Sequence, residues 1–299
     1  MTERFIKEPI IVKKDGSFIQ DEIRTTLYLP HADTHAAPPE LLLPGIGQDG
    51  RIPPHILENT SGIAVADALP YRQLRPDDLE HTTTSLRTLA WQYSIAAIRA
   101  YQRFYQNDAA PDILAESQQA IGASSAESKA PHLFGDMLYI RPIGMGVDQL
   151  GDTPGERLKT FGKRAVKAAI QGPHLDFYNA YSGYRILRPF GRGVLNQFRA
   201  GLSESIVPTL ERRVPERHKK GKRTILMAST DDRLTPAEEI REAQEKINRK
   251  FGTNILELIE KSNSWHVSLA TKPGLDDLAF ALHYLRNPKE KTSDSMVSY

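Results

Sequence analysis

Three polar side chains, Ser117, Asp232 and His266, each follow a short apolar run in this sequence. The three runs cover residues 112–116, 224–229 and 254–259. Apolar runs of this length are typical of buried strands. Serine, then acid, then histidine is one of the few chain orders in which proteins assemble a nucleophile, an acid and a base at the ends of strands. This order therefore restricts the fold more than any other feature of the chain.

The rest of the chain alternates predicted strands with predicted helices. The first two β-rich runs flank the turn-forming residues 14–17, which indicates an antiparallel hairpin. The predicted strands cover 5–12, 24–29, 40–43, 62–67, 112–116, 137–141, 224–229 and 254–259, and the predicted helices cover 82–106, 118–128, 236–251 and 275–285. This alternation predicts an α/β fold with a mostly parallel central sheet flanked by helices.

Residues 147–220 interrupt the alternation. They contain no clear strand, and Gly and Pro divide them into helical stretches. We therefore expect a helical cap at 147–220, inserted into one core domain formed by 1–146 and 221–299. The cap region is basic, because residues 156–223 hold 16 Lys and Arg against 5 Asp and Glu. A solvated basic face is the favoured explanation; we expect no nucleic-acid partner, and contact with an anionic membrane surface stays open.

Composition restricts the remaining chemistry. The 299-residue chain has no cysteine, which excludes disulfides and a cysteine nucleophile and fits a reducing compartment. It shows no signal-peptide pattern and no apolar stretch of about 18 residues, so we expect a cytoplasmic protein. Phosphate-binding and dinucleotide-binding fingerprints and metal-ligand spacings are missing too, so we expect no cofactor and no metal. The oligomeric state is left open.

Together these features resemble the α/β-hydrolase fold over nearly the full length of the chain. The resemblance rests on the opening hairpin, the loop 44–47 after a strand, a serine between a strand and a helix, the inserted cap, and the loops of Asp232 and His266. It implies a serine hydrolase that cleaves a carboxylic ester or related acyl bond of a small-molecule substrate through Ser117, His266 and Asp232. The alternatives are a catalytically inactive protein with this fold and a binding module that uses the basic cap.

Ser117 matches the nucleophile of this fold by its place between a strand and a helix. In the fold, the serine occupies a strained turn, so the residues two places before and after it must be small. Ala115 meets this requirement. Gln119 departs from the Gly or Ala that the family has there, and we expect Ala120 and Gly122 to provide the close contact instead. The other explanation of Ser117 is a helix N-cap.

The acid and the base follow from loop positions. Asp232 resembles the family's acid because a hydrophobic residue and then Pro236 follow it before a helix; capping of that helix is the other explanation. His266 is one of nine histidines, and we favour it because a late loop reaches the carboxyl edge of the sheet. Two alternatives rank lower: Asp148 as the acid, and Ser124, which has no strand before it, as the nucleophile.

The resemblance also implies an oxyanion hole made of two backbone N–H groups. One belongs to Gln118, directly after the nucleophile, and the other to Ile46, where Gly45 and Gly47 let the backbone approach closely. We expect the aromatic residues of the cap to line a substrate pocket. They are Phe161, Phe177, Tyr178, Tyr181, Tyr184, Phe190 and Phe198.

Overall fold

The structure is a computed structural model of the chain. It describes residues 2–14, 17–29, 38–45, 63–66, 86–171, 205–262 and 272–287. Among the calls from sequence, His266, Ile46 and the part of the cap between 172 and 204 lie outside these residues.

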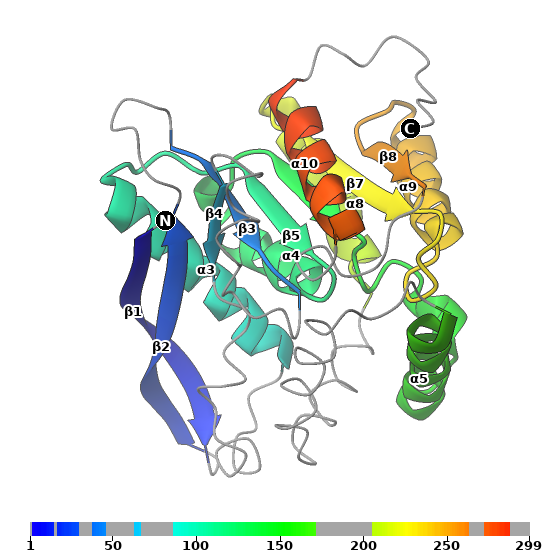
Figure 1. The fold of residues 1–299 in the computed structure, drawn as a ribbon, viewed down its shortest axis with the longest axis horizontal. Coiled ribbons are helices and arrows are strands. Elements are labelled where there is room, and N and C mark those ends of the chain that lie inside the picture. Colours follow the sequence, from blue (N-terminus) through cyan, green and yellow to red (C-terminus); the bar gives the residue numbers. More distant parts are fainter. Residues whose placement is uncertain are drawn as a thin grey trace.

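An eight-stranded sheet with the order β1-β2-β4-β3-β5-β6-β7-β8 forms the centre of the molecule (Figure 1). The strands are β1 (Thr2–Lys14), β2 (Ser17–Leu29), β3 (Glu40–Leu43), β4 (Ile63–Ala66), β5 (Ile113–Glu116), β6 (Met137–Ile140), β7 (Thr224–Ser229) and β8 (Glu257–Lys261). β1 and β2 form the predicted antiparallel hairpin, and β2 pairs antiparallel with β4. From β4 to β8 every pairing is parallel, which confirms the predicted α/β class.

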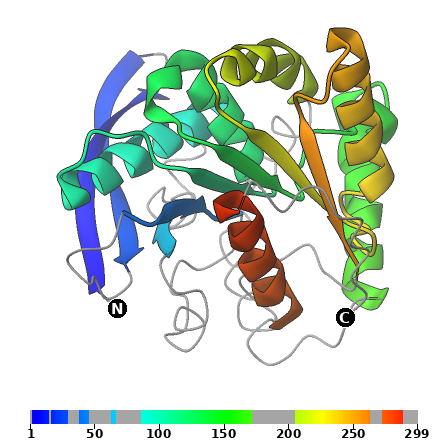
Figure 2. The same ribbon diagram turned by 90° about the horizontal axis from the view of Figure 1, so that it is seen from above.

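Helices cover both faces of this sheet (Figure 2). One face carries α3 (Leu86–Tyr105), α4 (Gln119–Lys129), α8 (Val207–Lys219) and α9 (Ala237–Phe251), and the other carries α10 (Lys272–Arg286). A further helix, α5 (Pro154–Gln171), lies beside α9. Since crossovers between parallel strands place helices on the sheet faces, the inner strands β3 to β7 are buried on both sides and appear in the sequence as apolar runs.

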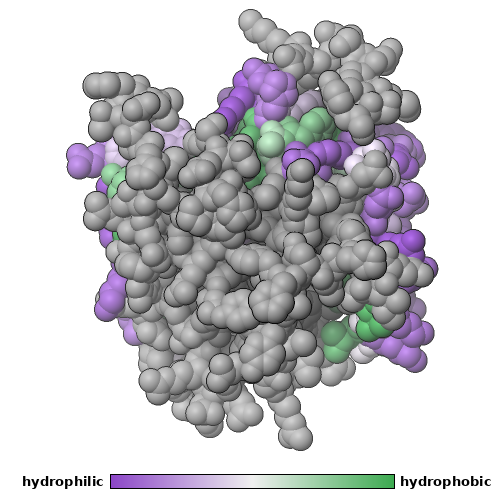
Figure 3. All heavy atoms as spheres, viewed as in Figure 1, coloured by the Kyte–Doolittle hydropathy of each residue, from purple (hydrophilic) through white to green (hydrophobic). Residues whose placement is uncertain are grey.

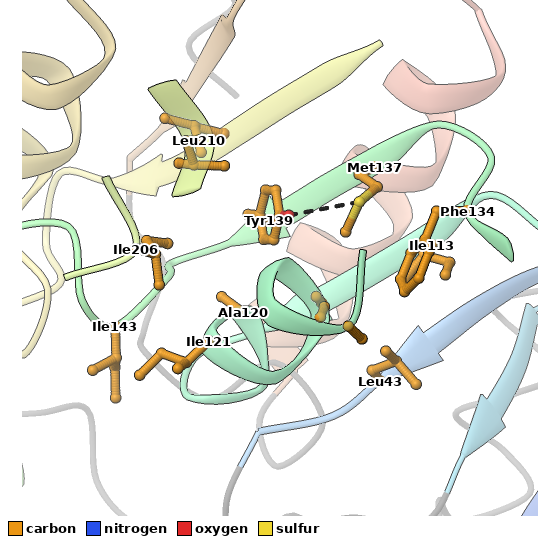
Figure 4. Packing of buried hydrophobic residues seen from close by; sticks show 14 of the residues in the cluster. Leu43, Ile113, Ala120, Ile121, Phe134, Met137, Tyr139, Ile143, Ile206 and Leu210 are labelled. Atoms are coloured by element: carbon orange, nitrogen blue, oxygen red, sulfur yellow. Dashed lines mark hydrogen bonds between the residues drawn. The ribbon is translucent and has the colours of Figure 1, made fainter. Parts of the chain in front are cut away.

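Along each buried strand, successive side chains point to opposite faces of the sheet. Leu41 and Leu43 of β3 belong to the larger cluster under α3, α4, α8 and α9, whereas Leu42 packs with α10 in the smaller one. Figure 4 shows part of the larger cluster around α4, with Tyr139 donating a hydrogen bond to the sulfur of Met137 at 3.6 Å. Burial raises the pKa of the Tyr139 hydroxyl. The period of two therefore decides which helix each strand residue contacts.

The last strand begins later than the sequence predicts. We expected it to run over 254–259, but β8 covers Glu257–Lys261. The amide side chain of Asn248 in α9 explains the shift, because it donates to the carbonyl of Leu256 (2.9 Å) and accepts from its N–H (3.0 Å). A backbone whose polar groups are bound in this way is not available to a sheet ladder.

The predicted division into core and cap stays a prediction, because residues 172–204 are not described. The part of the inserted region that is described again from Ser205 returns to Gly144, just before the region begins, because the Gly144 carbonyl accepts from the Ser205 hydroxyl (3.1 Å) and the Ile206 N–H (3.0 Å). The expectation of a solvated basic face is wrong for Arg217, which is 3% exposed and lies 3.3 Å from Glu127. Part of the basic bias in the sequence therefore belongs to buried ion pairs.

The described surface is polar along one margin. Figure 3 shows hydrophilic residues where α9 and α5 lie, interrupted by a small apolar area over α5. Among the described helices, none is both long and apolar enough to cross a bilayer.

Candidate active site

Ser117 lies where the order of the parallel strands reverses. The chain passes from β3 outward to β4 and then returns to β5 on the other side of β3. In open α/β sheets such a reversal leaves a crevice at the carboxyl ends of the strands, where ligands bind. Ser117 follows β5 and Gly45 follows β3, so the two residues meet at the carboxyl ends of these neighbouring strands. A Cβ added to Gly45 would lie 2.9 Å from the Cβ of Ser117.

The backbone of Ser117 has the conformation of a sharp strand-to-helix turn. Its φ is +54°, in the left-handed region that L-residues other than Gly rarely adopt. The N–H of Ser117 donates to the carbonyl of Ile140 (2.9 Å), and its own carbonyl accepts from the N–H groups of Ala120 (3.2 Å) and Ile143 (3.1 Å). These bonds hold a conformation that costs about 1–3 kcal/mol by itself. Such strain is characteristic of a nucleophile elbow and is not needed for a helix N-cap.

The bulky Gln119 does not disrupt this turn. It is 1% exposed, and its side-chain N–H donates to the hydroxyl of Ser94 on α3 at 2.8 Å. The tight approach of the two helices occurs one turn later, where a Cβ on Gly122 would lie 2.9 Å from both the Cβ and the carbonyl oxygen of Ala90. This contact joins α4 to α3, so the expectation that Ala120 and Gly122 supply the close contact between strand and helix stays a prediction.

Ser124, the rival nucleophile, is an interior residue of α4. It is buried, and its hydroxyl donates to the carbonyl of Ile121 at 3.1 Å. A serine that bonds back to its own helix in this way is an ordinary helix residue. Of the two serines, only Ser117 lies at a strand end.

Asp232 follows β7 in a rigid loop. One carboxylate oxygen accepts from the N–H groups of Leu234 (2.8 Å) and Thr235 (3.2 Å), and the other accepts from the Thr235 hydroxyl (2.6 Å). The side chain is 5% exposed. Because α9 begins at Ala237 after the N-cap residue Pro236, these contacts organise the loop and do not cap the helix. Asp232 is thus a fixed, buried carboxylate two strands from Ser117, with β6 between.

Of the remaining predicted site residues, the structure describes Asp148 and Gln118 but not His266 and Ile46. Asp148 lies in the 3₁₀ turn Val147–Leu150 after β6. Gln118 has helical backbone angles at the start of α4, and the backbone hydrogen bonds of the described residues leave its N–H without an acceptor. Its role as an oxyanion donor stays a prediction.

Sequence reasoning missed a buried charge network beside the elbow. We call it the carboxyl-edge cluster: Glu116, Arg141, Asp277 and Lys261. The guanidinium of Arg141 lies 2.8 Å from Asp277 and 3.4 Å from Glu116, and all three side chains are fully buried. Lys261 lies 3.0 Å from the second oxygen of Asp277. The available signal was Glu116 itself, because an acid inside a buried strand needs a charged partner.

The described residues contain no group of three or more His, Asp or Glu side chains that could hold a metal ion. The expectation that the protein needs no metal or cofactor stays a prediction.

Comparison with known proteins decides the fold. No protein-family model and no curated protein sequence matches the chain. Solved structures do, among them Est816, an N-acyl homoserine lactone degrading enzyme, with a TM-score of 0.58 and 13% identity over 92% of this chain and 99% of that one. The chain has the α/β-hydrolase fold. This confirms the resemblance and the fold class that the sequence predicts.

Two further solved structures also match this chain over nearly the full length of both chains. MGS-M2, an α/β hydrolase from a Medee basin deep-sea metagenome library, gives a TM-score of 0.54 at 15% identity, covering 92% of this chain and 96% of that chain. Epoxide hydrolase VrEH1 from Vigna radiata gives 0.53 at 13% identity, covering 94% and 98%. Likeness at this identity concerns the α/β-hydrolase fold alone, because one fold hosts many chemistries.

Proposed function

We propose that the protein is a serine hydrolase that cleaves a carboxylic ester or related acyl bond, with Ser117 as nucleophile, His266 as general base and Asp232 as the acid that orients the histidine. The observation that carries the proposal is the elbow: Ser117 has φ +54° at the end of β5, with Gly45 packed against it. A strained backbone lowers the stability of the fold, and such strain is found mostly at functional sites. The similar structures, which include hydrolases, support the same class of reaction.

The reaction follows from the positions of these groups. The Ser117 hydroxyl attacks the acyl carbon while its proton passes to His266. The negative charge on the former carbonyl oxygen is stabilised by the N–H groups of Gln118 and Ile46. The leaving alcohol takes the proton from His266, and an acyl group remains on Ser117. Water then attacks this ester with His266 as base, which releases the acid and restores the serine.

Asp232 has a supporting role in this scheme. It holds His266 in the tautomer that accepts a proton and stabilises the imidazolium that forms. Its three hydrogen bonds to Leu234 and Thr235 leave it little freedom to move. A carboxylate that is already oriented loses no rotamer freedom during the reaction.

A fluorophosphonate probe tests the proposal. Its phosphorus accepts the serine oxygen and fluoride leaves, so labelling reports a reactive hydroxyl. We expect labelling of the wild type and of Ser124→Ala at neutral pH, and none of Ser117→Ala. Loss of labelling in His266→Ala and Asp232→Ala would assign the other two roles.

The alternatives predict different results. A catalytically inactive protein leaves the wild type unlabelled although it is folded. A binding module that uses the basic cap region shows no labelling but binds anionic vesicles in a salt-dependent manner. Labelling that persists in Ser117→Ala would contradict the proposed nucleophile. The small-molecule acyl substrate, the cytoplasmic location and the absence of a nucleic-acid partner stay predictions.

A further inference from the structure

Arg141 follows β6, the strand between those of Ser117 and Asp232, and it is fully buried. Its φ is +46°, so Ser117 and Arg141, at adjacent strand ends, both have left-handed backbones. The N–H of Arg141 donates to the carbonyl of Met227 in β7 at 2.8 Å. A charged residue is expensive in such a position, both because of its burial and because of its backbone. Its contacts therefore need an explanation beyond stability.

Those contacts reach three other elements. Glu116, the residue directly before Ser117, lies 3.4 Å from one guanidinium nitrogen of Arg141, and Asp277 of α10 lies 2.8 Å from another. Asp277 then pairs with Lys261, the last residue of β8, at 3.0 Å. The two cations and two anions balance, so the cluster carries no formal net charge.

The chain between the last two elements carries the proposed base. His266 lies in the sequence between Lys261, which ends β8, and Lys272, which begins α10. The carboxyl-edge cluster holds the described residues on both sides of this segment, Lys261 and Asp277, and joins them to the residue before the nucleophile.

We propose that Arg141 is a positioning residue whose ion pairs with Glu116 and Asp277, extended by Lys261, set the nucleophile elbow relative to the ends of the segment that carries His266. This inference rests on the proposed serine-hydrolase function. Positioning of this kind acts on the chemical step, because a shift of about 1 Å between reacting groups costs roughly 100-fold in rate.

The test removes the outermost member of the cluster. Lys261 is partly exposed, so Lys261→Met is expected to fold. It breaks the link to β8 and leaves Arg141 and Glu116 in place. The rate constant for fluorophosphonate inactivation, kinact, should fall about 10-fold or more while the binding constant KI changes less than about 2-fold. Lys261→Arg, which keeps the charge, should recover most of kinact.

A matched control lies on the same strand. Arg241 pairs with Glu260, the neighbour of Lys261 in β8, at 2.7 Å on the surface. Arg241→Met should leave kinact unchanged. Asp277→Asn, which keeps the size of the side chain, should lower kinact at least as much as Lys261→Met; its fold is checked by circular dichroism.

The outcomes separate the two proposals. If the wild type is not labelled at Ser117, the serine-hydrolase proposal fails. If it is labelled, and folded Lys261→Met and Asp277→Asn react at the wild-type kinact, the positioning role of Arg141 is overturned while the proposed function stands. An equal loss in Arg241→Met, or a loss confined to KI, would likewise overturn the positioning role.

Discussion

Within the described part of the chain, two buried arginine clusters lie at opposite ends of the parallel strands of one sheet. The carboxyl-edge cluster lies beside Ser117. The second, which we call the amino-edge cluster, consists of Arg213, Arg217 and Glu127. Here Arg217 donates to the carbonyls of Gly135 (2.6 Å) and Arg223 (2.8 Å), just before β6 and β7. Helix α4 connects the two clusters, because it begins after Ser117 and carries Glu127 near its other end.

The two clusters use the same residue types for different purposes. At the amino edge, Arg217 satisfies backbone carbonyls and the hydroxyl of Thr224 (2.9 Å), so it closes the ends of strands. At the carboxyl edge, Arg141 pairs with Glu116, directly before the proposed nucleophile, and with Asp277 in α10, the helix that follows the segment of the proposed base. Ligands bind at the carboxyl ends of parallel strands. Loss of an ion pair should therefore lower stability at the amino edge and slow the chemical step at the carboxyl edge.

The largest effect is expected at Arg217. Arg217→Met leaves the carbonyls of Gly135 and Arg223 without their donor and Glu127 with only Arg213 as a partner among the described residues. This should lower the free energy of unfolding by about 3–5 kcal/mol. Urea denaturation measures this loss. Arg212→Met, at an exposed position of the same helix, should change it by less than about 0.5 kcal/mol. Folded Arg217→Met should be labelled by the fluorophosphonate at the wild-type rate. Slow labelling would show that the amino-edge cluster also affects the chemical step.

A smaller loss, in chemistry, is expected at Gly45. Gly45→Ala places a methyl group 2.9 Å from the Cβ of Ser117 and 3.5 Å from its hydroxyl oxygen, so the loop or the elbow must move. We expect kinact for the fluorophosphonate to fall about 100-fold, or about 2.7 kcal/mol. Gly162→Ala is the control, because an added methyl group there meets no atom within 4 Å. An unchanged kinact would show that this loop is remote from the reaction.

Gln119 lies between the two edges, in the first turn of α4. Gln119→Ala removes its hydrogen bond to Ser94 and leaves a cavity, which should lower the free energy of unfolding by about 2 kcal/mol. Because Ser117 keeps its own backbone bonds, kinact should stay within about 2-fold. Gln149→Ala, at an exposed position, serves as the control for stability. A large fall in kinact would mean that Gln119 holds the elbow directly.

The smallest effect concerns Asp112 at the amino edge. Its carboxylate accepts from the N–H of Asp136 at 2.6 Å, and burial raises its pKa. The folded protein therefore binds this proton more tightly than the unfolded chain, and stability is lost as pH rises from the unfolded value of about 3.9 through the folded one. Asp112→Asn should be more stable than wild type at pH 7, with a gain that shrinks toward pH 4. Asp108→Asn, at an exposed position, should show no such dependence in urea denaturation.

The fold was largely predictable from short patterns. The hairpin, the apolar strands and the helix before β5 were recognisable because each depends on neighbouring residues. β8 was misplaced because Asn248, outside the strand, binds the backbone of Leu256. A hydrogen bond between elements leaves no periodic trace in the sequence.

The proposed site was predictable to a different degree. Ser117 and Asp232 were found from strand ends and loop composition, and the structure places both at the carboxyl edge. Gln119 was noted as a departure from the family pattern, but its hydrogen bond to Ser94 of α3 could not be predicted from the sequence. Arg141 was missed because its partner Asp277 is 136 residues away.

The sequence by itself determined the α/β class, the order of the proposed catalytic residues along the chain and the serine that follows a strand, because local periodicity and turn chemistry specify these features. Only the tertiary structure decided that Ser117 has a strained backbone against Gly45, that Gln119 packs on α3, and that two arginine clusters separate to opposite edges. These features arise from contacts between elements distant in the chain. In such buried contacts, an unpaired charge or a steric clash has a large cost in free energy.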